Sequence, residues 1–482
     1  MKGIKKQFGR LGSAAVWITG VLILGCVDDL DGVPCVENDD CESGVCVDGT
    51  CAGTGDADGD TDGDTDSDSD ADADVMVDVA YTLPLSGVDI LLVVDDTGSM
   101  VQEQEILTTS LFNLINNITE DMLGAVGPVA DGLDIRLAVT TTDMGVSFDG
   151  QPYNEIFSPH PVCSLNAGFG NDGMMLTEYN ADSFSTTLGN KISCSKTDNA
   201  CPPDWNCADI NATGVGVCRP ANGSDAIVCP DVSAFVENEM YLTPGAEAAA
   251  ALGYGYREFV SAGACLSNVG TDGCAFEQQL SAVPAALTKH GQGVFLREDA
   301  LTVVIVISDE NDCSLATDEW HVVPELNTNE RNVACGLHED MMMDIVDLRN
   351  QILDAKTVAT GVPSAGSIIF AAITGVPMVD ECQGFGSSLT HCGDVALAHG
   401  TMASPSIIER MDPNGNPAIY YEYACERFDN EGIPITQAYP ATRIVELARI
   451  FGNYGYVYSI CNSDWTPAMD DISARITESL SR

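Results

Sequence analysis

Two groups of oxygen-bearing side chains follow apolar runs that have the length of a β-strand. Asp95, Thr97 and Ser99 stand at alternating positions after the first run. The second run is followed by Ser308, Asp309, Glu310, Asn311 and Asp312. Carboxylates, hydroxyls and waters in an octahedron are the ligands that Mg²⁺ prefers, with Mn²⁺ or Ca²⁺ as alternatives. The residue types therefore predict a divalent-metal site. The alternative is a metal-free turn in which Asp, Thr and Ser cap the following helix.

The elements that position these groups alternate between strand and helix along the chain. Runs rich in Leu and β-branched residues predict buried strands at residues 88–94, 135–140, 301–307, 367–373 and 456–460. Apolar residues at helical spacing predict helices after Ser99 and at residues 246–260, 277–288, 340–355, 441–451 and 470–480. This order is typical of the α/β class, here a doubly wound, mostly parallel sheet flanked by helices. Ligands bind beyond the carboxyl ends of the strands in such a sheet, which is where both groups stand.

The first group lies within a segment that has a specific resemblance. Residues 93–100 read Val-Val-Asp-Asp-Thr-Gly-Ser-Met and resemble the Asp-x-Ser-x-Ser signature of von Willebrand factor type A (vWA) domains, their metal-ion-dependent adhesion site. Thr97 stands in place of the usual middle Ser and keeps the hydroxyl. The resemblance extends in pieces over residues 83–482 and implies a vWA-like, Rossmann-like head.

Two further loops complete the resemblance. Gly-Thr-Asp-Gly at residues 270–273 resembles the second vWA loop, which supplies a threonine. Asp309 matches the acid of the third loop, with Glu310 where Gly is usual. In the family the hydroxyls bind the ion directly, and the acids bind it directly or through water. The ligand set implied for this chain is Asp95, Thr97, Ser99, Thr271 and Asp309.

The resemblance also implies how the site would be used. One metal position stays open, and a carboxylate from a protein or extracellular-matrix ligand would complete the octahedron. The chain itself has 20 Lys and Arg against 73 Asp and Glu, a formal charge of −53. This charge opposes an acidic partner at long range, and it excludes nucleic-acid binding because phosphates would be repelled.

Cysteine usage indicates an oxidising compartment. The chain has 19 cysteines and no Cys-x-x-Cys pair, which favours disulfides over zinc or redox motifs. Six cysteines fall in residues 152–230 and three in residues 376–438. Both segments are rich in turn residues and interrupt the strand–helix alternation, so we interpret them as disulfide-rich insertions that could determine partner specificity.

One disulfide would join two of the predicted metal loops. Cys274 follows Thr271 by three residues, and Cys313 follows Asp309 by four. Both thiols should therefore lie at the same edge of the sheet, and we hypothesise a Cys274–Cys313 bridge. The alternative is that each cysteine pairs elsewhere, for example Cys313 with Cys335.

The N-terminus predicts export and a lipid anchor. Residues 1–25 join a basic start to an apolar stretch that is too short for a membrane-spanning helix, as in a signal peptide. The Ile-Leu-Gly-Cys ending resembles the lipobox of bacterial lipoproteins and implies lipidation of Cys26. Residues 26–52 would then be a small lipid-anchored cystine module. Its candidate disulfide residues are Cys35, Cys41, Cys46 and Cys51.

An acidic segment separates this module from the head. Residues 53–82 include an Asp at every second position from 56 to 74. Such a run repels itself and cannot bury a core, so it predicts an extended linker. The alternative is weak, diffuse calcium binding.

The sequence lacks the common catalytic motifs. It contains no Gly-x-Ser-x-Gly elbow, His-Glu-x-x-His or Gly-rich phosphate loop, so we expect no enzyme. The expected function is that of a bacterial lipoprotein anchored at the outer membrane or cell surface, whose head binds a ligand through Mg²⁺ or another divalent ion. The alternatives are a structural assembly protein with a metal-stabilised head and a hydrolase hidden in the insertions.

Overall fold

The computed structural model divides the chain into two units, residues 1–74 and 75–482. It describes residues 85–126, 134–144, 171–178, 230–238, 240–271, 273, 276–290, 294–316, 333–337, 339–360, 367–411, 417–429 and 431–481, and short strands at 46–47, 50–51, 147–148, 151–152, 193–195, 205–208 and 215–220. In the first unit β1 (Cys46–Val47) and β2 (Thr50–Cys51) form an antiparallel hairpin with Cys46 opposite Cys51. The signal peptide, the Asp-rich linker and the candidates Cys26, Cys35 and Cys41 lie outside the described residues.

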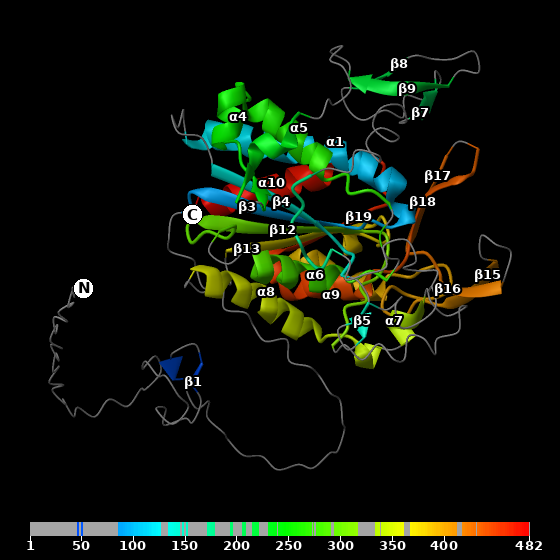
Figure 1. Cartoon of the computed structure of the whole chain (residues 1–482). Coiled ribbons are helices and arrows are strands. Elements are labelled where there is room, and N and C mark those ends of the chain that lie inside the picture. Colours follow the sequence, from blue (N-terminus) through cyan, green and yellow to red (C-terminus); the bar gives the residue numbers. More distant parts are fainter. Residues whose placement is uncertain are drawn as a thin grey trace, which may run out of the picture. The chain divides into compact units, whose positions relative to one another are not determined.

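An eight-stranded mixed sheet forms the centre of the second unit (Figure 1). Its spatial order is β10 (Val236–Glu237), β11 (Tyr241–Leu242), β4 (Asp134–Thr141), β3 (Gly87–Val94), β12 (Ala300–Ser308), β13 (Ile368–Thr374), β19 (Gly455–Ser459) and β14 (Gly384–Phe385). The strands from β4 to β19 pair in parallel, whereas the pairings at both edges are antiparallel. The unit therefore belongs to the α/β class and has a parallel centre.

Helices cover both faces of this sheet. Figure 1 shows α1 (Val101–Val126), α4 (Glu247–Leu252), α5 (Tyr256–Leu266) and α10 (Thr466–Leu480) on one face, and α6 (Gln279–Ala285), α8 (Ile345–Thr360) and α9 (Thr442–Ile450) on the other. Successive residues of β3 alternate between two buried cores. Ile90 and Leu92 pack in the core that contains α1, α5 and α10, and Leu91 and Val93 in the core that contains α6, α8 and α9. Because both faces are buried, residues 90–94 of the strand form a continuous apolar run rather than an alternating one.

The five predicted strands are confirmed, each within one residue at either end. The helix predicted at residues 246–260 is wrong as a single element. It is divided into α4 and α5 because Gly253 adopts φ 74°, a left-handed conformation that ends a helix. α10 begins at Thr466, four residues before its predicted start, with a Pro in its first turn.

Apart from β14 at the edge of the central sheet, the segment 376–438 contributes two hairpins that lie outside that sheet. β15 (Ile407–Met411) pairs with β16 (Pro417–Tyr421), and β17 (Cys425–Phe428) pairs with β18 (Pro434–Ala438). One disulfide, Cys382–Cys392, lies within the segment, and a second, Cys425–Cys461, joins it to the chain just beyond β19. The first link closes a loop within the segment, and the second fixes the segment to the chain that follows β19.

Little of the segment 152–230 belongs to the described residues. Its described part includes β7 (Ser193–Ser195), β8 (Trp205–Ala208) and β9 (Val215–Pro220), which form a three-stranded sheet in the order β7-β9-β8. The remaining short elements are β5 (Ser147–Phe148), β6 (Gln151–Pro152) and α7 (Ala334–Leu337). Among the helices of the described ranges, none has both the length and the apolar character needed to cross a membrane.

Candidate metal centre

The two predicted groups of polar residues meet at one edge of the sheet. β3 and β12 pair in parallel with Val94 opposite Ile307, and the Asp95 amide donates to the Ile307 carbonyl at 2.9 Å. Asp95 and Asp309 follow these two paired positions. They therefore lie beyond the carboxyl ends of neighbouring strands, where open α/β sheets bind ligands.

Close polar contacts join four of the predicted ligands. Asp95 Oδ1 accepts from the Thr97 amide at 2.9 Å and from Thr97 Oγ1 at 2.7 Å. Thr97 Oγ1 lies 3.1 Å from Ser99 Oγ, which donates to Asp309 Oδ1 at 3.2 Å. Thr97 makes no side-chain capping bond to the helical turn that follows, so helix capping does not explain its position. Ser99 is exposed and the other three are buried, which leaves the group accessible from one side.

The fifth predicted ligand, Thr271, lies in a loop held beside this group. Gln104 of α1 is 1% exposed and donates through Nε2 to the Asp95 carbonyl at 2.9 Å and to the Gly270 carbonyl at 2.7 Å. It also accepts from the Gly270 amide at 3.2 Å. One buried amide therefore fastens the Thr271 loop to the end of β3, and Thr271 itself is half-buried.

Gly273 has no room for a side chain. Its amide donates to the Asp96 carbonyl at 2.8 Å, and a Cβ at this position would lie 2.2 Å from Asp96 Oδ1. We expect Gly273→Ala to displace the Thr271 loop and to weaken Mg²⁺ binding by about tenfold, or about 1.4 kcal/mol, in a calorimetric titration. Gly245→Ala is the control, because a Cβ there meets its nearest atom, Thr243 Oγ1, at 3.8 Å. Equal Mg²⁺ affinity in the two variants would contradict the role given to Gly273.

A second, buried layer of polar residues supports Asp95, and two of its members, Glu277 and Gln279, were not predicted from the sequence as site residues. Ser308 Oγ lies 2.7 Å from Asp95 Oδ2 and 3.1 Å from Glu277 Oε2. Gln279 Nε2 donates to Ser308 Oγ at 2.8 Å and to Glu277 Oε2 at 3.1 Å. Glu277 is only 1% exposed. The only local signal, polar residues at the end of a strand and the start of a helix, is equally typical of ordinary caps.

Burial raises the pKa values of several carboxyl groups here. Burial, together with nearby carboxylates, raises the pKa of Asp96 to about 8. Burial and then the charge of Asp95 raise the pKa of Glu310 to about 8. The pKa values of Glu277 and Asp309 are also raised well above the ordinary range, by burial first and then by Asp95. So many buried acids require protons or a cation to offset their charge.

The donor set fits a hard divalent cation. All its atoms are oxygens, and Glu277 Oε1 beside it is buried without a hydrogen-bond partner among the described residues. No three Asp, Glu, His or Cys side chains in the described ranges converge closely enough to hold a metal by themselves. The hydroxyls of Thr97 and Ser99 would therefore have to contribute ligands.

No family model matches the chain, and no curated protein matches its sequence. The assignment of this centre therefore depends on its own residues.

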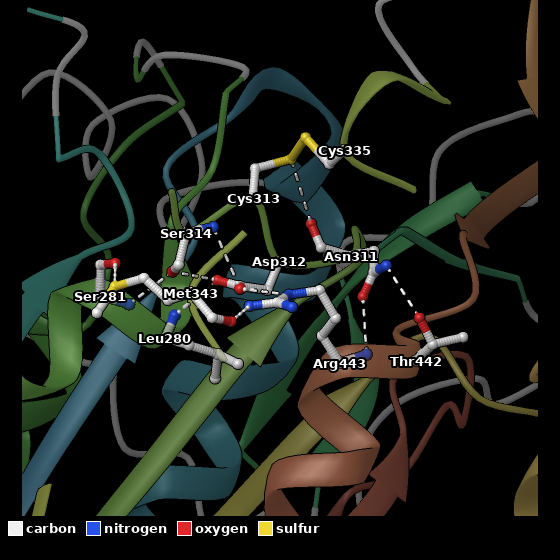
Figure 2. Close-up of polar contacts among 10 residues, drawn as sticks. All are labelled: Leu280, Ser281, Asn311, Asp312, Cys313, Ser314, Cys335, Met343, Thr442 and Arg443. Carbon is white, nitrogen blue, oxygen red and sulfur yellow. Dashed lines mark hydrogen bonds and ion pairs between the residues drawn. A yellow bond between two sulfur atoms is a disulfide. The ribbon is translucent and has the colours of Figure 1, made fainter. Parts of the chain in front are cut away.

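A buried ion pair fixes the loop that follows Asp309 (Figure 2). Asp312 is fully buried and accepts from Nε of Arg443, on α9, at 3.0 Å. The same carboxylate accepts from the Leu280 amide at 2.9 Å and from Ser314 Oγ at 2.6 Å. The first turns of α6 and α9 are thereby joined to the loop three residues beyond Asp309.

Cys313 forms its disulfide with Cys335, so the predicted Cys274–Cys313 bridge is wrong. Figure 2 shows the Cys313 side chain directed away from Arg443 and toward Cys335, whereas Asp312 points to Arg443. Neighbouring side chains of this loop thus point in opposite directions, which residue spacing could not reveal. Cys274 lies outside the described residues.

Proposed function

We propose that this chain is a bacterial envelope lipoprotein whose vWA-like head binds a protein or matrix ligand through one divalent metal ion. One observation is the main support for this proposal. Asp95, Thr97, Ser99 and Asp309 form a connected set of oxygen donors at the end of two parallel strands, with an exposed hydroxyl on the solvent side. Their residue types and order resemble the adhesion-site pattern, with Thr97 in place of the usual middle Ser.

The proposed roles of the residues follow from their positions. Thr97 and Ser99 supply hydroxyl ligands, Thr271 a third from the loop that Gln104 holds, and Asp95 and Asp309 the negative charge. A bound Mg²⁺, or Mn²⁺ or Ca²⁺, supplies a positive charge that can accept the carboxylate of a partner. The Asp312–Arg443 ion pair holds the Asp309 loop in place, so the ligands need little rearrangement on binding.

The anchor belongs to the same proposal. Lipidation at Cys26 would hold the N-terminus at the membrane, and the extended linker at residues 53–82 would separate the head from the lipid surface. The linker would also allow the head to reach a ligand on a neighbouring surface. The strong negative charge of the chain opposes acidic partners at long range, so the metal ion would provide the attraction at contact.

Calorimetric titration of Mg²⁺ into the chelator-treated chain tests the proposal. We expect saturable binding with one-site stoichiometry, and we expect Asp95→Ala plus Asp309→Ala to abolish it because two acidic ligands are lost. The control is Asp347→Ala plus Asp394→Ala, which removes the same charge from two exposed positions. The Asp-rich linker is identical in all three proteins and contributes the same weak background. Identical titrations of the two double variants would reject the proposal.

A further inference from the structure

A second pair of carboxylates lies beyond the ends of β3 and β4, on another strand pair than the candidate metal centre. These strands pair in parallel with Val94 opposite Thr141, and the Thr142 amide donates to the Val94 carbonyl at 3.2 Å. Asp96 and Asp143 each stand two residues past the Val94–Thr141 pair. The register therefore brings them to neighbouring positions, and both are buried, with exposed fractions of 9% and 3%.

The Asp96 carboxylate is enclosed on two sides. Thr141 Oγ1 accepts from the Asp143 amide at 3.3 Å and donates to the Asp96 carboxylate. Gly273 packs against the same carboxylate, because a Cβ there would lie 2.2 Å from Asp96 Oδ1. A strand end and the Thr271 loop thus form the walls of this small polar site.

The Asp96 carboxylate is not fully hydrogen-bonded by the described residues around it. Its Oδ1 atom is buried and has no hydrogen-bond partner in the described part of the chain. The charges that act most strongly on it are those of two other acids, Asp143 and Asp95. A buried carboxylate oxygen without a donor or a cation costs a considerable free energy, so either a proton or a cation must offset it.

We propose that Asp96 and Asp143 hold a second cation, of the calcium type, between the ends of β3 and β4. Two carboxylates and the Thr141 hydroxyl offer only oxygen, which suits a hard cation. Calcium tolerates irregular geometry and six to eight oxygen ligands, and backbone carbonyls and waters supply the remainder. None of the five residues assigned to the adhesion-type centre is a ligand here, so this site does not depend on the proposed function.

The second ion would have a structural effect on the first centre. The Asp96 carbonyl accepts the Gly273 amide at 2.8 Å, and Gly273 belongs to the loop that presents Thr271. An ion bound to the Asp96 side chain would hold this contact in place. The competing explanation is that Asp96 and Asp143 share a proton and bind no ion.

Equilibrium dialysis of calcium against the full chain tests the second site. We expect the wild-type chain to bind one more tight Ca²⁺ than Asp143→Asn, over the same weak background from the Asp-rich linker. Thr141→Val removes only the hydroxyl and should weaken that ion about tenfold. Asp394→Asn is the control, because it removes one carboxylate from a side chain that is 89% exposed.

The possible results distinguish the second site from the adhesion-type centre. A tight ion that is lost in Asp143→Asn and retained in Asp309→Asn supports the second site, whatever the result at the adhesion-type centre. A chain whose tight calcium binding is unchanged in Asp143→Asn overturns the second site, and an ion lost only in Asp309→Asn then still supports the proposed function. If Asp143→Asn does not fold, as judged by circular dichroism, Thr141→Val decides, and wild-type calcium affinity in that variant rejects the proposal.

Discussion

Metal-free protein is expected to lose stability as the pH rises from about 5 to about 8, and divalent ions are expected to abolish much of that loss. The cause is the group of buried acids around the ends of β3 and β12. Burial raises the pKa of Asp96 and that of Glu310 to about 8, and the pKa values of Glu277 and Asp309 are raised as well. In the unfolded chain all four lose their protons near pH 4.

The direction in which stability changes with pH follows from the number of protons bound to the folded and to the unfolded chain. Between about pH 4 and pH 8 the folded state holds protons that the unfolded chain has released, so raising the pH favours unfolding. The full contribution to stability is present below the unfolded pKa and is lost as the pH passes through the folded pKa. For Asp96 alone, the shift to about 8 corresponds to a loss on the order of 5 kcal/mol. A bound cation replaces the protons and removes the dependence.

Urea unfolding followed by circular dichroism measures this effect, with a chelator in one series and Mg²⁺ and Ca²⁺ in another. Asp96→Asn should reduce the pH dependence of the metal-free series by the Asp96 contribution, because the amide cannot ionise, and should leave the contributions of the other three acids. Asp172→Asn, a substitution at a half-exposed ion pair, should leave it unchanged. Metal-free stability that stays constant or rises between these pH values would show that the buried acids are compensated in another way.

The central strands could be predicted from the sequence because burial on both faces leaves a strong local pattern. All nine residues of β12 are buried, and all are apolar or small. The edge strands β10, β11 and β14 have two residues each and no periodicity, so they could not be predicted. The division of α4 from α5 depends on the left-handed conformation of Gly253, and Gly is also tolerated within helices.

The candidate site also has a part that could be predicted from the sequence and a part that could not. Asp95, Thr97 and Ser99 lie within five residues, so their alternation is visible in the sequence. Glu277 and Ser308 are 31 residues apart and meet only because α6 begins beside the end of β12. No local sequence pattern indicates such a contact. That an ion binds here stays a prediction, whereas the meeting of the loops is a property of the fold.

The buried Asp312–Arg443 pair should be the most sensitive single contact of the site's supporting structure. Arg443→Met removes the cation but leaves Asp312 fully buried, and Arg443 Nη2 also donates to the Met343 carbonyl at 2.7 Å. Breaking a buried pair by removing one partner leaves an uncompensated charge, so we expect a loss of about 3 to 5 kcal/mol in the free energy of unfolding. Urea unfolding at neutral pH measures it.

Arg449→Met is the matched control for this prediction. Arg449 lies on the same helix and pairs with Glu446 at 2.6 Å, but both side chains are more than one-third exposed, at 38% and 44%. Water compensates the remaining charge there, so the expected loss is at most about 1 kcal/mol. The difference in the loss of unfolding free energy between the two variants measures the effect of burial, because both variants replace the same residue type on α9. Equal losses would mean that Asp312 finds compensation without Arg443, and the loop beyond Asp309 would then be held mainly by the Leu280 and Ser314 hydrogen bonds.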